Sequence, residues 1–137
     1  MPFELLEHPA DIGFRATAPT LPDLFVESAL AMLSIAADPA NVEPRHEYPI
    51  SVESGDIESL LVDWLNEVLY WFDGRRIAFH DFRLESFSPT AIQAIGRGEP
   101  RDAERHQARL IVKAVTYHQL RIEERHGAWI AEVFLDI

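Results

Sequence analysis

The sequence predicts an α+β fold, in which a largely antiparallel sheet has two amphipathic helices packed on one face. Two segments carry apolar residues at helical spacing, and the second half of the chain consists mainly of short alternating runs typical of strands. A length of 137 residues with 47% hydrophobic residues suits one core. We therefore expect residues 1–137 to form a single domain.

The first third of the chain predicts two strands and a helix. Phe3 to Leu6 and Ile12 to Ala18 are apolar segments on either side of a polar break at His8 to Asp11. Thr20-Leu21-Pro22-Asp23 then combines an N-cap candidate with an early proline and an acidic residue three positions after the cap. Apolar residues continue at helical spacing, so we expect a helix from about Pro22 to Ala37.

The middle of the chain predicts a third strand and a second helix. Tyr48 to Val52 is typical of a strand, and Ser54-Gly55-Asp56 then precedes a segment whose apolar residues recur every three or four positions. This apolar stripe runs from Ile57 to Phe72, and Asp73-Gly74 closes it. Both helices are thus amphipathic covers for a sheet.

The remainder of the chain predicts strands. We expect them at Ile77 to Phe87, Ala91 to Ile95, Ala108 to Tyr117, Leu120 to Glu124 and Ala128 to Leu135. His126-Gly127 predicts a tight hairpin between the last two, because glycine supplies the positive φ that such turns need. Residues 96–106 alternate in charge, which favours an exposed loop that makes ion pairs.

Charge and composition restrict the classes of function. Twenty-three acidic and twelve basic residues give a net charge of −11, which repels nucleic-acid phosphates and anionic membranes but favours docking onto a basic protein, including one that holds RNA. The lack of cysteine excludes disulfides and thiolate chemistry. Met1-Pro2-Phe3-Glu4 lacks the basic region of a signal peptide, and no apolar stretch reaches the ~18 residues of a membrane span. We expect a cytoplasmic protein.

Carboxylates near both ends of the chain are the candidate site. Asp11 lies in the break between the first two predicted strands, and Asp136 precedes Ile137, whose α-carboxylate ends the sequence. If the fold brings these groups together, a divalent cation has to offset their repulsion, and oxygen ligands favour Ca²⁺, Mg²⁺ or Mn²⁺ over zinc. The alternatives are that Asp11 is a turn residue hydrogen-bonded to its own backbone and that Asp136 is a solvated acid at the end of a strand.

Three more residues are candidates for auxiliary roles beside that site. His8 and His118 could each ligate a metal or carry a proton. The alternatives are that His8 is a surface histidine before a proline and that His118 is a turn residue. Lys113 follows an alternating apolar pattern, so it could bind an anionic substrate or protect a sheet edge against aggregation.

Several segments, taken together and in order, resemble the archease family. They are His8-Pro9-Ala10-Asp11-Ile12-Gly13, Leu61-Val62-Asp63-Trp64-Leu65-Asn66-Glu67, Gly98-Glu99-Pro100-Arg101-Asp102 with Arg105-His106, Lys113-Ala114-Val115-Thr116-Tyr117-His118 and Asp136-Ile137. The sequence departs from the family pattern at Pro9, where threonine is frequent, and at Gln119, where an acid is common.

The resemblance implies a protein cofactor rather than an independent enzyme. Archeases activate the RtcB-type RNA ligase of tRNA splicing and RNA repair by promoting guanylylation of the ligase's histidine and multiple turnover, so RNA would be reached only through the ligase. By the same resemblance, Asp11, Asp136 and Ile137 match the family's divalent-cation site. Two other functions stay open. One is an independent metal-dependent phosphoester hydrolase with His8 or His118 as base, and the other is a chaperone-like accessory of RNA-modifying enzymes.

Overall fold

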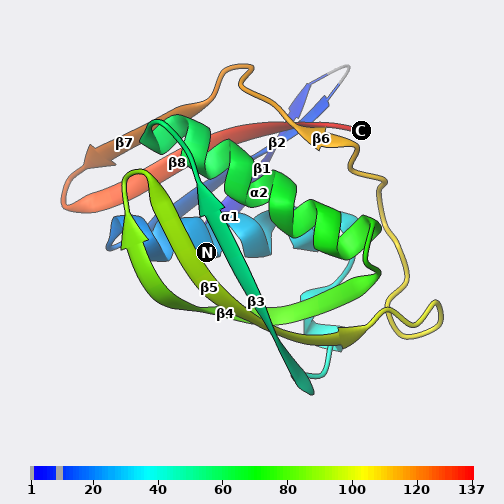
Figure 1. The fold of residues 1–137 in the computed structure, drawn as a ribbon. Helices are drawn as coiled ribbons and strands as arrows, with labels where there is room; N and C mark the ends of the chain where they lie inside the picture. The colour runs from blue at the N-terminus through cyan, green and yellow to red at the C-terminus, as the bar shows by residue number, and fades with distance from the viewer. Residues whose placement is uncertain (1, 9–10) are drawn as a thin grey trace.

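Two antiparallel sheets and two α-helices form the structure (Figure 1). It is a computed structural model that describes the backbone of residues 2–8 and 11–137 and the side chains of residues 2–6 and 11–137. The α+β class, the single domain and the two helices predicted from the sequence are confirmed. The strands, however, divide between two sheets, where the sequence predicted one. Strand periodicity shows which residues face a core but does not show which neighbour a strand pairs with.

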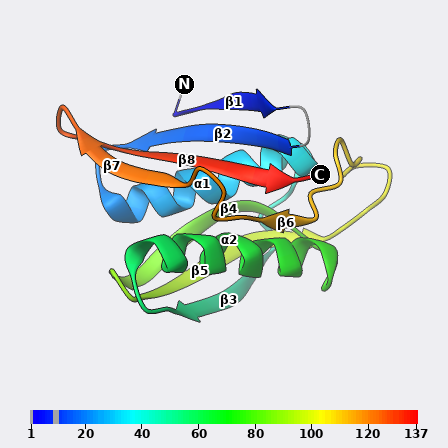
Figure 2. The ribbon, with the colours of Figure 1, turned by 90° about the horizontal axis from the view of Figure 1, so that it is seen from above.

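The larger sheet joins the two ends of the chain. Its central pairing is between β2 and β8, so segments from opposite ends of the sequence lie side by side (Figure 2). Its strands are β1 (Phe3–His8), β2 (Asp11–Ala18), β8 (Ala128–Asp136) and β6 (Ala114–Val115) in that order, with β7 (Arg121–Arg125) also paired to β8. The predicted hairpin between β7 and β8 is confirmed, with Gly127 at a φ of 78°.

The smaller sheet has the order β3 (His46–Glu53), β5 (Ala91–Pro100) and β4 (Ile77–Ser88). Strand β5 extends five residues beyond the predicted end at Ile95, so the prediction of an exposed loop from residue 96 onward is wrong for residues 96–100. A side chain at Gly98 would bring a Cβ to 1.9 Å from the carbonyl oxygen of Ala78. Glycine is required there for the close approach of β5 to β4.

The two helices begin where the sequence predicts. Helix α1 (Leu21–Ala36) is capped by the Thr20 hydroxyl, which accepts from the Asp23 amide at 3.2 Å. Helix α2 (Ile57–Asp73) is capped by the Asp56 carboxylate, which accepts from the Ser59 amide at 2.8 Å. Each cap satisfies an amide that has no partner inside its own helix. A short 3₁₀ turn, η1 (Pro39–Asn41), follows α1.

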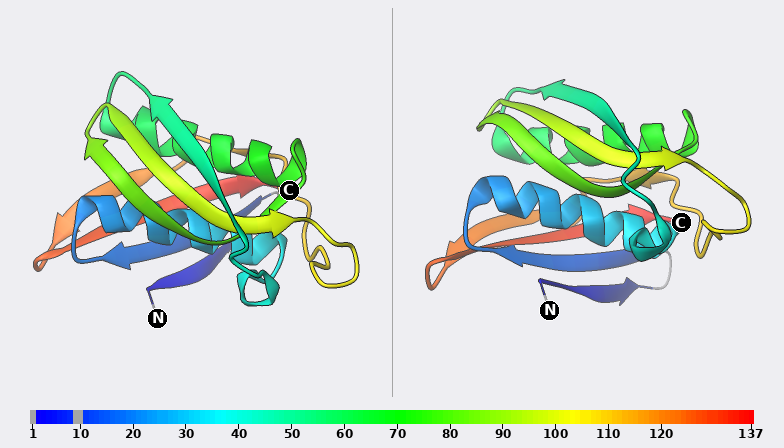
Figure 3. Two further views of the ribbon diagram at one scale, coloured as in Figure 1. Left: turned by 60° about the horizontal axis from the view of Figure 1, so that its bottom comes forward. Right: turned by 90° about the horizontal axis from the view of Figure 1, so that it is seen from below.

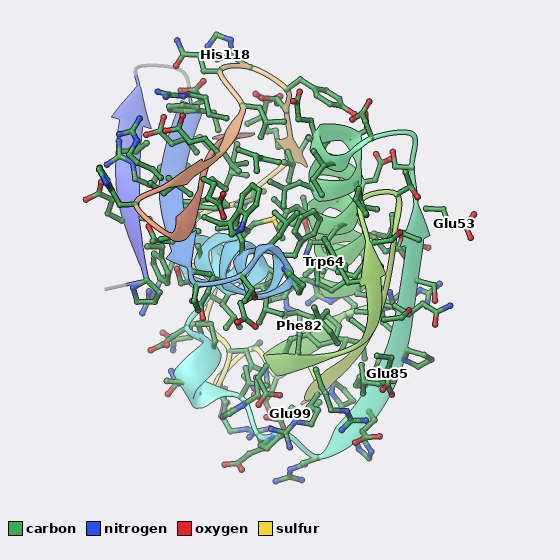
Figure 4. The ribbon with its side chains drawn as sticks, turned by 90° about the vertical axis from the view of Figure 1, so that its left-hand side faces the viewer. Glu53, Trp64, Phe82, Glu85, Glu99 and His118 are labelled. Atoms are coloured by element: carbon green, nitrogen blue, oxygen red, sulfur yellow. The ribbon has the colours of Figure 1, made fainter. Side chains whose placement is uncertain are left out.

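The core lies between the sheets and around the helices. Helix α1 packs against β2 and β8 of the larger sheet and against β4 of the smaller one, while α2 packs against β3, β4 and β6 (Figure 3). Trp64 of α2 is fully buried, and its indole N–H donates to the carbonyl oxygen of Phe25 in α1 at 2.9 Å. Its ring lies edge-on to Phe82 of β4, with the centroids 5.5 Å apart (Figure 4). This one side chain therefore connects both helices to the smaller sheet.

The predicted strand at Ala108 to Tyr117 is mostly absent, because only Ala114 and Val115 form a strand. Val112 and Val115 are buried, whereas Ile111 is 74% exposed, so burial does not follow the two-residue period of a strand. Within residues 2–8 and 11–137, no helix has both the length and the apolar character required to cross a membrane.

Candidate metal centre

Asp11 and Asp136 lie directly opposite each other on neighbouring strands. They are register partners at the end of the β2–β8 pairing, and the next pair, Ile12 and Leu135, is buried in the core. Because side chains alternate between the faces of a sheet, both aspartates lie on the outer face, away from the helices. Directly opposite residues of an antiparallel pair have Cβ atoms about 4.5–5.5 Å apart. Two like charges are thus held close together by backbone pairing alone.

One carboxylate oxygen of this pair is buried without a hydrogen-bond donor among the described residues. The Oδ1 atom of Asp11 has almost no solvent contact and no hydrogen-bond partner among the described residues. The Asp136 side chain is exposed. Burying a carboxylate oxygen without a donor or a cation is unfavourable, so the arrangement calls for a positive ligand that both aspartates can share. Carboxylate oxygens are the donors that hard divalent cations prefer.

The second row along the same sheet face from the aspartates shows what the aspartate row lacks. Across β1, β2, β8 and β7 the opposed residues are Glu4, Arg15, Glu132 and Arg121, so every acid faces a base. Arg15 pairs with Glu4 and donates through Nε to Glu132 at 2.7 Å, and the bond to Glu132 raises the pKa of Arg15. By contrast, no basic side chain among the described residues lies within 4.0 Å of the two aspartates.

The other residues predicted for the metal site adjoin this pair. Ile137 follows Asp136 and is 41% exposed. His8 is the register partner of Asp11 on β1, but its side chain lies outside the described residues. The described side chains contain no group of three His, Cys, Asp or Glu residues able to hold a metal. The aspartate pair therefore needs further ligands of another kind, such as the α-carboxylate of Ile137, water or a partner group.

Strand β6 supports the pair from the other side. Lys113 donates its backbone N–H to the carbonyl oxygen of Asp136 at 2.8 Å, but its side chain is exposed. Asn66 of α2 accepts from the Val115 amide at 3.0 Å and donates to the Val115 carbonyl at 3.3 Å. The Asn66 side chain thus satisfies the backbone N–H and C=O of Val115 on the outer edge of β6, which would otherwise be an unpaired sheet edge.

A buried aromatic side chain, Phe134, lies next to the aspartates along β8. The ring of Phe134 packs over Gly13, where a Cβ would lie 2.6 Å from the ring. Thr116 donates its backbone N–H to the Phe134 carbonyl, and the His118 ring stands 6.3 Å from the Phe134 ring. The predicted auxiliary residue His118 is therefore exposed beside Phe134, one alternate position along β8 from Asp136.

Replacing Gly13 with alanine should destabilise the fold by about 1 kcal/mol or more, since the new methyl group displaces the Phe134 ring. Gly55→Ala is the matched control, because a Cβ there meets nothing within 4 Å, and it should change stability by less than about 0.5 kcal/mol. Urea unfolding measures both. Equal effects at the two positions would show that the contact between Gly13 and Phe134 does not constrain the sheet.

The sequence missed a second group of charged residues, which is buried. Glu99 is 2% exposed and accepts hydrogen bonds from Arg105 at 2.9 and 3.1 Å and from the Glu43 amide at 2.9 Å. His106 is 3% exposed and lies 3.0 Å from Glu99 through Nε2. The hydrogen bonds of Arg105 are the largest cause that lowers the pKa of Glu99, to about 2.

This buried group holds the connection between β5 and β6 in place. The Nδ1 atom of His106 accepts from the Asp102 amide at 2.8 Å, so the ring proton is on Nε2 and is donated to Glu99. Glu99 and His118 lie at opposite ends of the molecule in Figure 4. Glu99 and His106 thus organise the fold and are separate from the aspartate pair. Their spacing of seven residues within the archease-like segments is the only sequence signal for them.

Comparisons with known proteins agree on one family. The sequence model of the Archease protein family (MTH1598/TM1083) matches residues 3–137. The chain is 39% identical to protein archease of Methanopyrus kandleri over 140 residues, covering 100% of both chains. It is 40% identical to protein archease of Methanosarcina mazei, covering 98% of this chain and 95% of that one.

Solved structures give the same result for the fold. The solution structure of protein 1598 of Methanobacterium thermoautotrophicum superposes with a TM-score of 0.82 at 32% identity, covering 99% of each chain. A crystal structure from Thermotoga maritima, described as an archease and possible chaperone, superposes with a TM-score of 0.70 at 19% identity, covering 96% of this chain and 94% of that one. At that lower identity the likeness concerns the fold alone.

Proposed function

The chain belongs to the archease family, and on that basis we propose that it is a protein cofactor that activates an RtcB-type RNA ligase. In this proposal the chain promotes guanylylation of the ligase's histidine and supports repeated turnover in tRNA splicing and RNA repair. The ligase holds the RNA and carries out the chemistry. Such a partner would place the chain in the cytoplasm.

The observation that carries the proposal is the opposed pair of Asp11 and Asp136, with a buried Asp11 oxygen that lacks a partner among the described residues. Asp11 and Asp136 would hold a divalent cation, with the α-carboxylate of Ile137 as a third ligand. The ion is Ca²⁺, Mg²⁺ or Mn²⁺ by the chemistry of the donors. A bound cation supplies positive charge to anionic phosphate groups.

The chain's own residues fix and present this pair. Backbone pairing of β2 and β8 sets the separation of the two carboxylates, and Asn66 secures β6 beside them. The pair lies on an outer sheet face and at the end of a strand, where a partner can approach. The net charge of −11 supports docking onto a basic, RNA-binding enzyme through electrostatic steering.

Formation of the ligase–GMP adduct tests the proposal. Asp11→Asn and Asp136→Asn should each reduce stimulation of the adduct by about tenfold or more, as expected for loss of a metal ligand. Glu53→Gln is the matched control, since it removes one exposed carboxylate from β3 of the smaller sheet (Figure 4) and should leave stimulation unchanged.

Full stimulation by both aspartate variants would refute the role of the pair. The chain alone, incubated with phosphoester substrates and the same metal, should show no hydrolysis. Metal-dependent hydrolysis that is lost in Asp11→Asn would instead support the independent hydrolase.

A further inference from the structure

The basic side chains that lack an acidic partner gather at one end of α2. Nine of the twelve lysine and arginine side chains lie within 4.0 Å of a carboxylate. Among the described residues, the three others are Arg75, Arg76 and Lys113. Arg75 and Arg76 directly follow Gly74, which ends α2, and Lys113 lines a hollow together with Gly74. In a chain of charge −11, three free cations in one place are available for an external anion.

A fourth cation, Arg101, and one acid, Asp73, adjoin the three cations without an acidic partner. Arg101 lies over the Phe72 ring at 4.2 Å, and burial together with the charge of Arg76 lowers the pKa of Arg101. Asp73 is the acid that lines the hollow, and it lies 3.7 Å from Arg101. Among the residues that line the hollow, Asp73 is thus the one carboxylate, and it already faces Arg101.

Aromatic rings accompany these cations. Tyr70 is 54% exposed, and its ring packs against Gly74. The Arg75 guanidinium lies over the Trp71 ring at 4.1 Å and 5.5 Å from the centre of the Tyr70 ring. A guanidinium held on an aromatic ring keeps its N–H groups for acceptors such as phosphate oxygens.

A surface hollow of about 370 Å³ lies at this end of α2, next to Arg75 and Arg76 along the chain. It is lined by Asn66, Leu69, Tyr70, Asp73, Gly74 and Lys113. Its size is within the range of small-molecule sites, roughly 300–1,000 Å³. The Lys113 backbone also bonds to Asp136, so the hollow adjoins the aspartate pair.

We propose that this basic–aromatic surface, formed by Tyr70, Arg75, Arg76 and Lys113, binds a nucleotide. The base stacks on Tyr70, and the phosphates bind the unpaired cations. An exposed aromatic ring next to phosphate-binding cations is the combination that recognises bases and phosphates together. A purely acidic peptide would use the cations and leave the exposed ring unused. The nucleotide is either free or at the end of a single-stranded RNA, and the acidic remainder of the surface confines binding to this hollow.

The test is a set of NMR titrations of the full chain in low salt with a chelator, which removes any metal bridge to the aspartates. GTP and a 5′-phosphorylated trinucleotide RNA are the two nucleotide probes, with inorganic triphosphate and hexaglutamate for comparison. A nucleotide should shift the amide signals of Tyr70, Gly74 and Lys113. The nucleotide probe that binds more tightly shows whether the ligand is a free nucleotide or the end of a single-stranded RNA.

Arg75→Ala with Lys113→Ala should weaken nucleotide binding at least about tenfold. Arg121→Ala with Arg125→Ala is the matched control, because it removes the same charge from β7 and should change affinity less than about twofold. Tyr70→Leu should weaken nucleotide binding about fivefold or more without changing the binding of inorganic triphosphate. Equal losses in the two double variants, or binding of hexaglutamate without either nucleotide, would overturn the proposal. Because the chelator excludes the cation, failure here leaves the role of Asp11 and Asp136 unaffected.

Discussion

Replacing Glu99 with alanine should destabilise the fold by about 3 kcal/mol, at the lower end of the range for breaking a buried ion pair. The change leaves the buried His106 and the Glu43 amide without their acceptor. The loss of folding stability stays at the lower end of that range because the Arg105 side chain is 44% exposed and can turn to solvent. Glu104→Ala is the matched control, since it removes an exposed acid from the same connection. Urea unfolding at neutral pH measures both.

The pH dependence of stability gives an independent measure of the same group. Glu99 has a pKa of about 2 in the folded chain, against an ordinary value of 4.5. Because the folded pKa is depressed, the stabilisation by Glu99 is complete above about pH 4.5 and is lost as the pH falls toward 2. The unfolding free energy of Glu99→Gln should therefore decline less steeply than that of the wild type across this window. Equal slopes, or an effect of Glu99→Ala no larger than that of Glu104→Ala, would contradict a structural role for the Glu99 group.

Neutralising Asp11 should have opposite effects without and with a divalent cation. In chelator, Asp11→Asn should be more stable than the wild type by about 0.5 kcal/mol, because it removes repulsion between directly opposed charges. With cation at a hundred times its wild-type dissociation constant, the wild type should gain about 2.7 kcal/mol, and the variant, if it binds at least about tenfold more weakly, about 1.4 kcal/mol or less. The order of stabilities should thus reverse.

Urea unfolding in chelator and in excess Ca²⁺, Mg²⁺ or Mn²⁺ measures this reversal. Glu53→Gln, the control on the other sheet, should follow the wild type in both conditions. If Asp11→Asn were less stable than the wild type in chelator and gained as much from the cation, the two aspartates would not share an ion.

Local patterns were sufficient for the elements that depend on local chemistry. Thr20 and Asp56 are N-caps in the structure, as their positions before helical patterns predict. The hairpin at His126 and Gly127 follows from its turn residues. The sequence also led to the hypothesis that Asp11 and Asp136 meet, and the structure places them as register partners. Whether they bind a metal stays a prediction.

Features that depend on distant contacts could not be predicted in the same way. Glu99 and His106 have the residue types of an exposed loop, and they are buried only because Arg105 and the Glu43 amide compensate them. Ile111 and Lys113 suggested a strand, but contacts from elsewhere fix that segment, such as the hydrogen bond from the Arg109 amide to the Ala36 carbonyl. The hollow beside Tyr70 likewise requires the end of α2 to meet residues about forty positions later.

The most direct test of the central claim is a calorimetric titration of Ca²⁺, Mg²⁺ and Mn²⁺ into the metal-free wild type and into Asp11→Asn, Asp136→Asn and Glu53→Gln. We predict saturable binding of one ion by the wild type and by Glu53→Gln, with affinity reduced at least about tenfold in each aspartate variant. Absence of binding to the wild type, or equal affinity in all four proteins, would contradict the account.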